Sequence, residues 1–201
     1  MKTKIILKCL LVSWLMLWSV FASAALSPPV EMLQNTTDQM LEGLKETSNR
    51  NTQSLYRLVR TILLPHADLD LMSQQVVGRY WAQATPAQRE EFKKQFTYFI
   101  TRTYSTALSS YSNQKVKFYP IRGGINGNRV QVNSTIIQNN GQNITVSYRL
   151  NLNNGQWKVY DFSVEGVSLV ENYRSQFADV LRTQGMEGLL DRLKSRNASL
   201  Q

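Results

Sequence analysis

The sequence has very few of the residues on which metal sites and covalent catalysis depend. Its 201 residues include one cysteine, Cys9, and one histidine, His66. A disulfide within the chain and a metal site with several cysteine or histidine ligands are therefore excluded. His66 directly follows Pro65, a position typical of a helix end, so we do not expect it to pair with a serine in catalysis.

The sequence also lacks the short motifs that mark nucleotide-binding proteins and common hydrolases. It contains no G-x-x-x-x-G-K-[ST] loop, no G-x-G-x-x-G turn after a strand, no G-x-S-x-G elbow and no H-E-x-x-H pair. We therefore expect no step driven by nucleotide hydrolysis within this chain, and no cofactor or metal is implied.

A long apolar run is absent as well. The longest, residues 9–21, has about 13 residues, whereas a membrane-spanning helix needs about 20. Three lysines precede this run, and small residues ending at Ala24 follow it. This layout predicts a secretory signal peptide over residues 1–24, cleaved after Ala24. An uncleaved membrane anchor is the alternative.

Removal of this leader leaves residues 25–201, a length that suits a single domain with its own core. Three of the 23 Lys and Arg residues lie in the leader, which leaves 20 against 14 acidic residues and a net charge of +6. Such a dispersed charge suits an anionic membrane surface or an acidic partner, although ordinary solubility explains it equally well. Nucleic acid is not an expected partner, because no basic stripe occurs.

Helical periodicity dominates the first half of the mature chain. Residues 28–48, 54–65 and 68–84 space their apolar residues at intervals near three and four, which predicts three helices. Thr85 then begins a fourth helix as its N-cap, and Gln88 completes a capping box. A long and mostly aromatic stripe follows along this helix. The stripe consists of Phe92, Phe96, Phe99, Ile100, Tyr104, Leu108 and Tyr111.

After Asn113 the pattern changes to that of strands. Four segments rich in Val, Ile, Tyr and Phe follow one another, and turn sequences with glycine separate them. These predicted strands are residues 115–119, 129–137, 144–152 and 157–164. Two helices, 167–182 and 186–196, follow on either side of Gly185. The order predicts an α+β fold, a four-stranded curled antiparallel sheet with helices packed on one face.

Two carboxylates, Asp161 and Glu165, lie four residues apart where the last strand turns into a helix. As a general acid and base they would have to converge on one substrate. In a regular strand Asp161 would lie on the same side as Trp157 and Val159, which is the apolar side. A charged residue at this position indicates a β-bulge. A negative charge is also favourable just before a helix. We therefore expect turn and helix-start residues, with a small isomerase or hydrolase in a cone-shaped pocket as the alternative.

Core packing accounts for any single residue of the aromatic stripe. Together with the apolar strand residues, however, the stripe supplies more large apolar side chains than core packing alone explains. Tyrosines such as Tyr80, Tyr104 and Tyr148 need a partner for the hydroxyl group when they are buried. The mouth of a pocket supplies such partners, and an apolar cavity with a few polar groups is typical of a small-molecule site. The residues alone thus favour an exported domain that holds an apolar ligand.

Several short strings then occur in an order that points to one known family. They are G-R-Y-W, A-T-P-A-Q-R and S-N-Q within residues 76–116, and W-K-V-Y-D, E-G-V-S and Y-R-S-Q-F within residues 157–193. Through them the chain closely resembles the MlaC family, also called toluene-tolerance proteins, from about residue 30 to 195. Residues 121–152 resemble the family more loosely.

The resemblance implies a periplasmic phospholipid carrier of a Gram-negative bacterium, not an enzyme. It implies that a glycerophospholipid passes between an outer-membrane lipoprotein and porin complex and an inner-membrane ABC transporter that bears an MCE-domain ring. The implied role is the maintenance of outer-membrane lipid asymmetry. The acyl chains would lie between the sheet and the helices, with the headgroup exposed.

We accordingly expect an apolar lipid cavity with side chains from the helices and the sheet around it. The expected lining residues are Met72, Val76, Tyr80, Phe96, Phe99, Ile100, Tyr104, Phe118, Val130, Val132, Val146, Tyr148, Trp157, Val159, Phe162, Val164, Val167, Val170 and Tyr173. The expected contacts to the headgroup at the rim are Arg79, Arg102 and Arg174. Asp161 and Glu165 are expected at the rim and the helix start.

Overall fold

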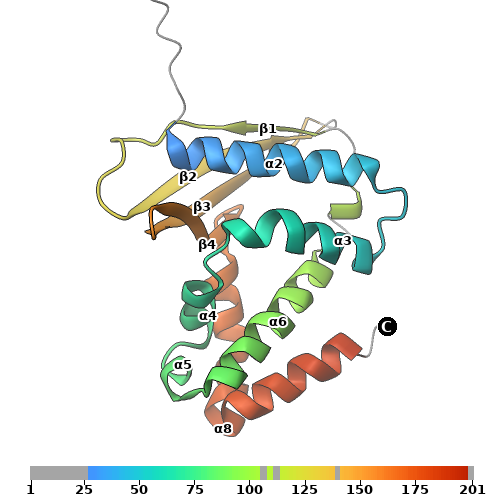
Figure 1. Cartoon of the computed structure of the whole chain (residues 1–201), viewed down its shortest axis with the longest axis vertical. Helices are drawn as coiled ribbons and strands as arrows, with labels where there is room; N and C mark the ends of the chain where they lie inside the picture. Colours follow the sequence, from blue (N-terminus) through green and yellow to red (C-terminus); the bar gives the residue numbers. More distant parts are fainter. Residues whose placement is uncertain (1–26, 105–107, 111–113, 139–140, 199–201) are drawn as a thin grey trace, which may run out of the picture.

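A computed structural model of the protein (Figure 1) describes residues 27–104, 108–110, 114–138 and 141–198. The predicted signal peptide with its cleavage after Ala24 lies outside the described residues, and so does Tyr111. Within the described part of the chain, no helix is both long enough and apolar enough to cross a bilayer.

One antiparallel sheet contains five strands in the order β1-β2-β3-β4-β5. The strands are β1 Lys115–Phe118, β2 Arg129–Ile137, β3 Asn143–Asn153, β4 Gln156–Val164 and β5 Val167–Ser168. The first four confirm the predicted strands within one residue at each end. The short β5 adds a strand to the four that the sequence predicted.

The predicted helix start at Val167 is wrong, because a tight turn first sends the chain back along β4. Glu165 and Gly166 have φ angles of 50° and 81°, and two successive residues with positive φ make the hairpin turn that best matches strand twist. The next residues pair with β4, Val167 opposite Val164, and the helix begins only at Leu169.

The strand register gives the sheet one apolar and one polar face. Val132 pairs with Tyr148, and Ile136 pairs with Ile144, so apolar side chains meet on the same face. Residues between them, such as Asn133 and Arg149, point to the other face. The predicted alternation of dry and wet positions is confirmed.

Helix α2, Pro28–Glu46, packs on this apolar face through its first half (Figure 1) and is followed by α3, Thr52–Leu58. The helix predicted over residues 54–65 is regular only in part. It widens into a π-helical turn, η1 Val59–Leu63, and tightens into a 3₁₀ turn, η2 Leu64–His66. Pro65 explains the irregularity, because proline cannot donate the helical hydrogen bond and its ring clashes with the preceding turn.

The helix predicted over residues 68–84 is broken into α4, Leu69–Val77, and α5, Tyr80–Gln83. Gly78 separates them with a φ of 58°, which residues other than glycine rarely adopt.

Helix α6, Pro86–Thr103, begins with the predicted capping box. Thr85 Oγ1 accepts the Gln88 N–H at 3.2 Å, and Gln88 Oε1 accepts the Thr85 N–H at 2.9 Å. The regular helix ends before the aromatic stripe does, because Tyr104 already has a φ of −100° and a ψ of 7°.

Helix α8, Leu169–Ala198, is bent at Gly185, where φ is 65° and ψ is −161°, so the predicted separation of two helices there is confirmed. Its second arm folds back along α6, as Figure 1 shows. Asn197 Nδ2 donates a hydrogen bond to the Gln95 carbonyl oxygen at 3.1 Å, which holds the end of α8 against α6.

Most of the buried apolar residues in the described part of the chain form three separate clusters. The largest fills the helical body, which we define as α4, α5, α6 and α8, and contains Phe92, Phe96, Tyr173 and Phe177 among others. The sheet cluster consists of Val30, Leu33, Val132 and Leu150. The third joins the end of α2 to α3 and η1 through Met40, Leu44, Leu55 and Val59.

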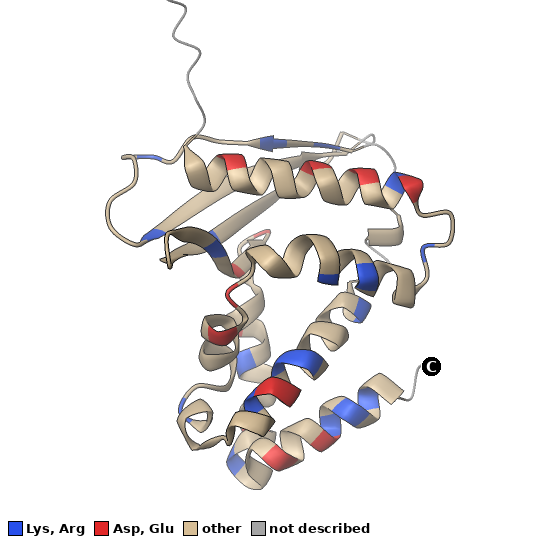
Figure 2. Ribbon diagram, in the orientation of Figure 1, with Lys and Arg blue, Asp and Glu red and all other residues tan. Residues whose placement is uncertain are grey.

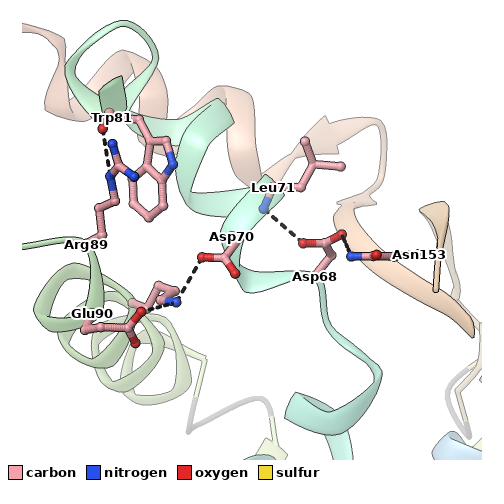
Figure 3. Close-up of polar contacts among 8 residues, drawn as sticks. Asp68, Asp70, Leu71, Trp81, Arg89, Glu90 and Asn153 are labelled. Atoms are coloured by element: carbon pink, nitrogen blue, oxygen red, sulfur yellow. Dashed lines mark hydrogen bonds and ion pairs between the residues drawn. The ribbon is translucent and has the colours of Figure 1, made fainter. Parts of the chain in front are cut away.

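Asp68 joins the helical body to the sheet (Figure 3). Its Oδ1 accepts the Leu71 N–H at 3.0 Å and so caps α4, while Oδ2 accepts a weak bond from Asn153 Nδ2 at 3.4 Å. Its own N–H donates to the Val159 carbonyl oxygen at 2.8 Å. In the same view Arg89 donates to the Trp81 carbonyl oxygen at 3.0 Å, which ties α6 to α5.

Candidate functional site

The predicted lining residues divide between the helical body and the sheet. Those in or against the helical cluster are Met72, Val76, Tyr80, Phe96, Phe99, Ile100, Phe162, Val170 and Tyr173. Those in or against the sheet cluster are Phe118, Val130, Val132, Tyr148, Trp157 and Val159. Val146 is buried, whereas Tyr104, Val164 and Val167 are exposed. The structure therefore gathers most of these residues into two groups.

The helical group is filled by its own aromatic rings. The Phe96 ring stacks on Phe92 at 5.3 Å between centroids and packs edge-on against Tyr173 at 5.3 Å. Phe99 packs edge-on against Tyr173 at 5.5 Å, and Phe177 stacks on Tyr173 at 5.6 Å. Because these rings pack against one another, the helical group agrees with the interpretation that these residues form a core.

The sheet group is covered only in part. Val132 and Leu150 are fully buried beneath the first half of α2, but Phe118, Tyr148 and Trp157 around them are half-buried. The Phe118 and Tyr148 rings lie 6.0 Å apart at a tilt of 35°. A sheet face that its own helices leave partly uncovered can shield an apolar ligand, which would complete the packing.

Several residues on or against this face were not among the predicted lining. Val30 and Leu33 from α2 belong to the sheet cluster together with Leu150. Ile136 and Ile144 face each other across β2 and β3 and are half-buried. The signals were present in the sequence, because the two isoleucines and Leu150 continue the strand alternation and Val30 and Leu33 have helical spacing.

Two hydroxyl groups interrupt the apolar face. Burial raises the pKa of the Tyr148 phenol, and the nearby Ser134 hydroxyl opposes this effect. Ser134 is fully buried, yet its Oγ has no hydrogen bond of normal geometry. These two hydroxyl groups lie next to apolar side chains and could form hydrogen bonds with an ester or hydroxyl group of a ligand.

A β-bulge in β4 removes Asp161 from the apolar face, as the sequence indicated. Arg149 pairs with Asp161 and Leu150 pairs with Val159, so Tyr160 is the extra residue. The Tyr160 ring stacks with the Arg129 guanidinium at 5.6 Å. Asp161 consequently lies with the polar residues near the start of α8.

Asp161 is fully buried, and its carboxylate is held by contacts within the protein. Its Oδ2 accepts the Ser168 hydroxyl at 2.7 Å, and its Oδ1 accepts the Val170 N–H at 3.1 Å in the first turn of α8. Arg149 Nη1 lies 3.3 Å from Oδ2 and 3.7 Å from Glu171 Oε1. Asp161 is therefore the helix-start group that the sequence predicted.

Glu165 does not converge on Asp161. Its carboxylate accepts the Thr145 N–H, and its own N–H donates to the Thr145 carbonyl oxygen at 2.9 Å, so it ties the turn between β4 and β5 to β3. The pair therefore cannot share a substrate as acid and base. Among the described residues, no group of three His, Asp or Glu side chains could hold a metal ion.

The three predicted rim arginines lie on different parts of the helical body. Arg79 follows Gly78 and donates to the Tyr80 hydroxyl at 3.2 Å. Arg102, in the last turn of α6, donates to the Arg196 carbonyl oxygen at 2.9 Å. Arg79 and Arg102 thus lie near opposite ends of α6, which is about 27 Å long at 1.5 Å per residue. Arg174 is exposed on α8.

An α+β domain with a partly covered apolar sheet face is typical of a binding protein for an apolar ligand. The family comparison is specific: the profile of the MlaC family, described as MlaC protein, matches residues 34–195. The chain belongs to the MlaC family, whose members are lipid-binding carriers and not enzymes.

Relatives and a solved structure agree with this assignment. The chain is 30% identical to the intermembrane phospholipid transport system binding protein MlaC of Haemophilus influenzae, over 83% of this chain and 80% of the relative. It is 31% identical to the toluene tolerance protein ttg2D of Pseudomonas putida, over 81% and 77%. The phospholipid-binding protein from Ralstonia solanacearum, solved in complex with a phospholipid, matches with a TM-score of 0.81 and 34% identity, over 87% of this chain and 99% of that one.

Proposed function

We propose that this protein is a periplasmic carrier that holds the acyl chains of a glycerophospholipid against the apolar face of its sheet. The observation that carries the proposal is the half-buried apolar surface around Tyr148 and Trp157. The similar Ralstonia structure, which contains a phospholipid, supports this ligand class. The headgroup would remain in water, because the interior offers few polar partners for it.

The proposed lining consists of the sheet group together with the residues of the helical body that face the sheet. Phe162 belongs here, because it lies in β4 yet packs against the helical cluster. The exposed Tyr104, Val164 and Val167 belong at the mouth. For the rim, Arg174 and Arg79 remain the proposed headgroup contacts, whereas the guanidinium of Arg102 already bonds the end of α8.

Release of such a ligand requires help. Each buried methylene contributes about 0.8 kcal/mol, so one chain of roughly 16 carbons gains on the order of 12 kcal/mol. The sequence contains no nucleotide-binding motif that could drive release. We propose direct transfer between an outer-membrane lipoprotein and porin complex and an inner-membrane MCE-domain ABC transporter, in the service of outer-membrane lipid asymmetry.

Native mass spectrometry of the mature chain, purified from a bacterial periplasm without detergent, tests the ligand class. We expect one glycerophospholipid per protein, identified by extraction after denaturation. The protein stripped of lipid should then take up lipid from vesicles. A protein that is empty on purification and takes up no lipid from vesicles would contradict the proposal.

A further inference from the structure

A separate pocket lies where α3, α6 and the end of α8 meet. It has a volume of about 360 Å³ and is lined by Tyr56, Lys94, Gln95, Tyr98, Lys194, Asn197 and Ala198. None of these residues belongs to the three apolar clusters. The pocket is therefore distinct from the proposed lipid site, and its volume falls within the range of small-molecule sites, about 300–1,000 Å³.

Asn197 gives the pocket an unsatisfied polar group. The residue is only 6% exposed. Its Nδ2 donates to the Gln95 carbonyl oxygen at 3.1 Å and to Gln95 Oε1 at 2.6 Å, whereas Oδ1 is buried without a partner. Buried acceptors without a hydrogen-bond partner are rare, because a missing hydrogen bond to a buried acceptor costs stability. A small rotation of the Asn197 side chain toward the pocket would let a hydroxyl or amine donor from a ligand satisfy Oδ1.

Two ammonium groups stand at the rim of the same pocket. Lys94 is exposed and has no ion-pair partner among the described residues. Lys194 Nζ lies 3.8 Å from Glu91 Oε1, a long and solvent-exposed pair of the kind that contributes little. Figure 2 shows further basic residues along the end of α8. Two ammonium groups complement an anion that carries about two negative charges, such as a phosphate monoester.

The remaining wall is aromatic. The rings of Tyr56 and Tyr98 pack edge-to-face, with 5.1 Å between centroids. Both residues are half-buried. Their rings offer an apolar surface next to the ammonium groups, so the pocket suits a ligand with a small apolar part beside its charge.

We propose that this pocket binds a phosphate monoester that also carries a hydroxyl or amine donor. The phosphate contacts Lys94 and Lys194, the donor bonds Asn197 Oδ1, and the carbon skeleton lies against the tyrosines. Such a group occurs on free glycerol phosphate and on the head of a lysophosphatidic acid. The proposal does not depend on lipid carriage at the sheet.

Calorimetric titration of the mature protein at low ionic strength tests this pocket, with sn-glycerol 3-phosphate and a short-chain lysophosphatidic acid as probes. We expect saturable binding of one sn-glycerol 3-phosphate per chain, and of one lysophosphatidic acid in this pocket in addition to any that the sheet holds. The double variant Lys94→Gln/Lys194→Gln should weaken binding at least about tenfold, the effect of losing one or two charge-assisted hydrogen bonds. The matched control Lys115→Gln/Lys117→Gln, which removes the same charge from exposed residues of β1, should bind as the parent does.

Asn197→Leu removes the acceptor but also the bonds that hold α8 to α6, so its unfolding is measured first. Both lysine positions are exposed, and their variants keep the test valid if this one unfolds. Binding of both probes identifies the phosphate as the recognised group, and binding of the lipid probe alone identifies a lipid source if the lysine variants lose it. Binding of the lipid probe alone that the lysine variants retain is binding at the sheet and would overturn the proposal. Failure of both probes, or equal weakening in the β1 control, would overturn the proposal. Lipid occupancy of the sheet site should not change in the lysine variants.

Discussion

The helical body and the sheet bury apolar residues in two different ways. In the helical body, the rings of Phe92, Phe96, Tyr173 and Phe177 touch one another and leave each other almost no exposed surface. On the sheet, a small buried cluster is surrounded by aromatic and aliphatic side chains that remain half-buried. The difference indicates that one region is a self-sufficient core, whereas the other is packed only in part, and we propose that a ligand completes its packing.

The largest expected effect comes from emptying the helical core. Phe96→Ala should lower the free energy of unfolding by about 3–5 kcal/mol, because a fully buried ring leaves a cavity. Phe118→Ala, on the half-buried sheet face, should cost only about 1 kcal/mol in the lipid-free protein. Denaturant unfolding measures both. Equal losses would remove the distinction between the two regions.

The next effect concerns the joint between β4 and α8. Asp161→Ala should cost about 1–3 kcal/mol, because the Ser168 hydroxyl and the Val170 N–H lose their buried acceptor. Asp161→Asn retains one acceptor oxygen and should cost less. Denaturant unfolding and lipid occupancy are measured for both variants. Full stability of Asp161→Ala would show that Asp161 does not anchor the helix start.

Filling the sheet face tests where the ligand lies. Val132→Trp or Val146→Trp should reduce lipid occupancy, with a loss of stability of about 1–3 kcal/mol from overpacking. The matched control is Ile137→Trp, because Ile137 lies on the same strand as Val132 but on the opposite, exposed face. Occupancy is read by native mass spectrometry. Full occupancy in correctly folded Val132→Trp protein would place the lipid elsewhere.

The smallest effect distinguishes two tyrosines by pH. Burial raises the pKa of Tyr148 on the sheet and of Tyr173 in the helical body above the usual value of 10.0. Each contribution to stability is complete below pH 10 and declines as the pH rises through the folded pKa, since the unfolded chain ionises first. Bound lipid should raise the pKa of Tyr148 further and leave that of Tyr173 unchanged. Tyrosinate absorbance of Tyr148→Phe and Tyr173→Phe proteins, with and without lipid, measures this; equal shifts would contradict it.

The sequence predicted the sheet well because each strand carries its own alternation and its own turn residues. The capping box at Thr85 and the break at Gly185 were equally local signals. The errors arose where a single residue overrides periodicity. Gly78 and Pro65 interrupt helices whose apolar spacing continues through them, and β5 is too short to show any period.

The site was harder to predict from the sequence than the fold, because periodicity indicates that a side chain is buried but not what covers it. Met72 and Tyr148 both follow apolar patterns, yet one packs in the helical core and the other lies half-buried on the sheet. The hydrogen bond of Arg102 could not be predicted either, since its partner, the Arg196 carbonyl oxygen, is 94 residues away in the chain. Only the tertiary arrangement decides such contacts.

The most direct test of the account uses two native tryptophans. Trp81 lies in the helical core, and Trp157 lies against the sheet cluster. In a chain prepared without residues 1–24, Trp81→Phe leaves Trp157 as the single tryptophan, and Trp157→Phe leaves Trp81. Both are loaded with a phospholipid that carries a spin label on its acyl chain. The account predicts strong quenching of Trp157 fluorescence and little quenching of Trp81; stronger quenching of Trp81 would contradict it.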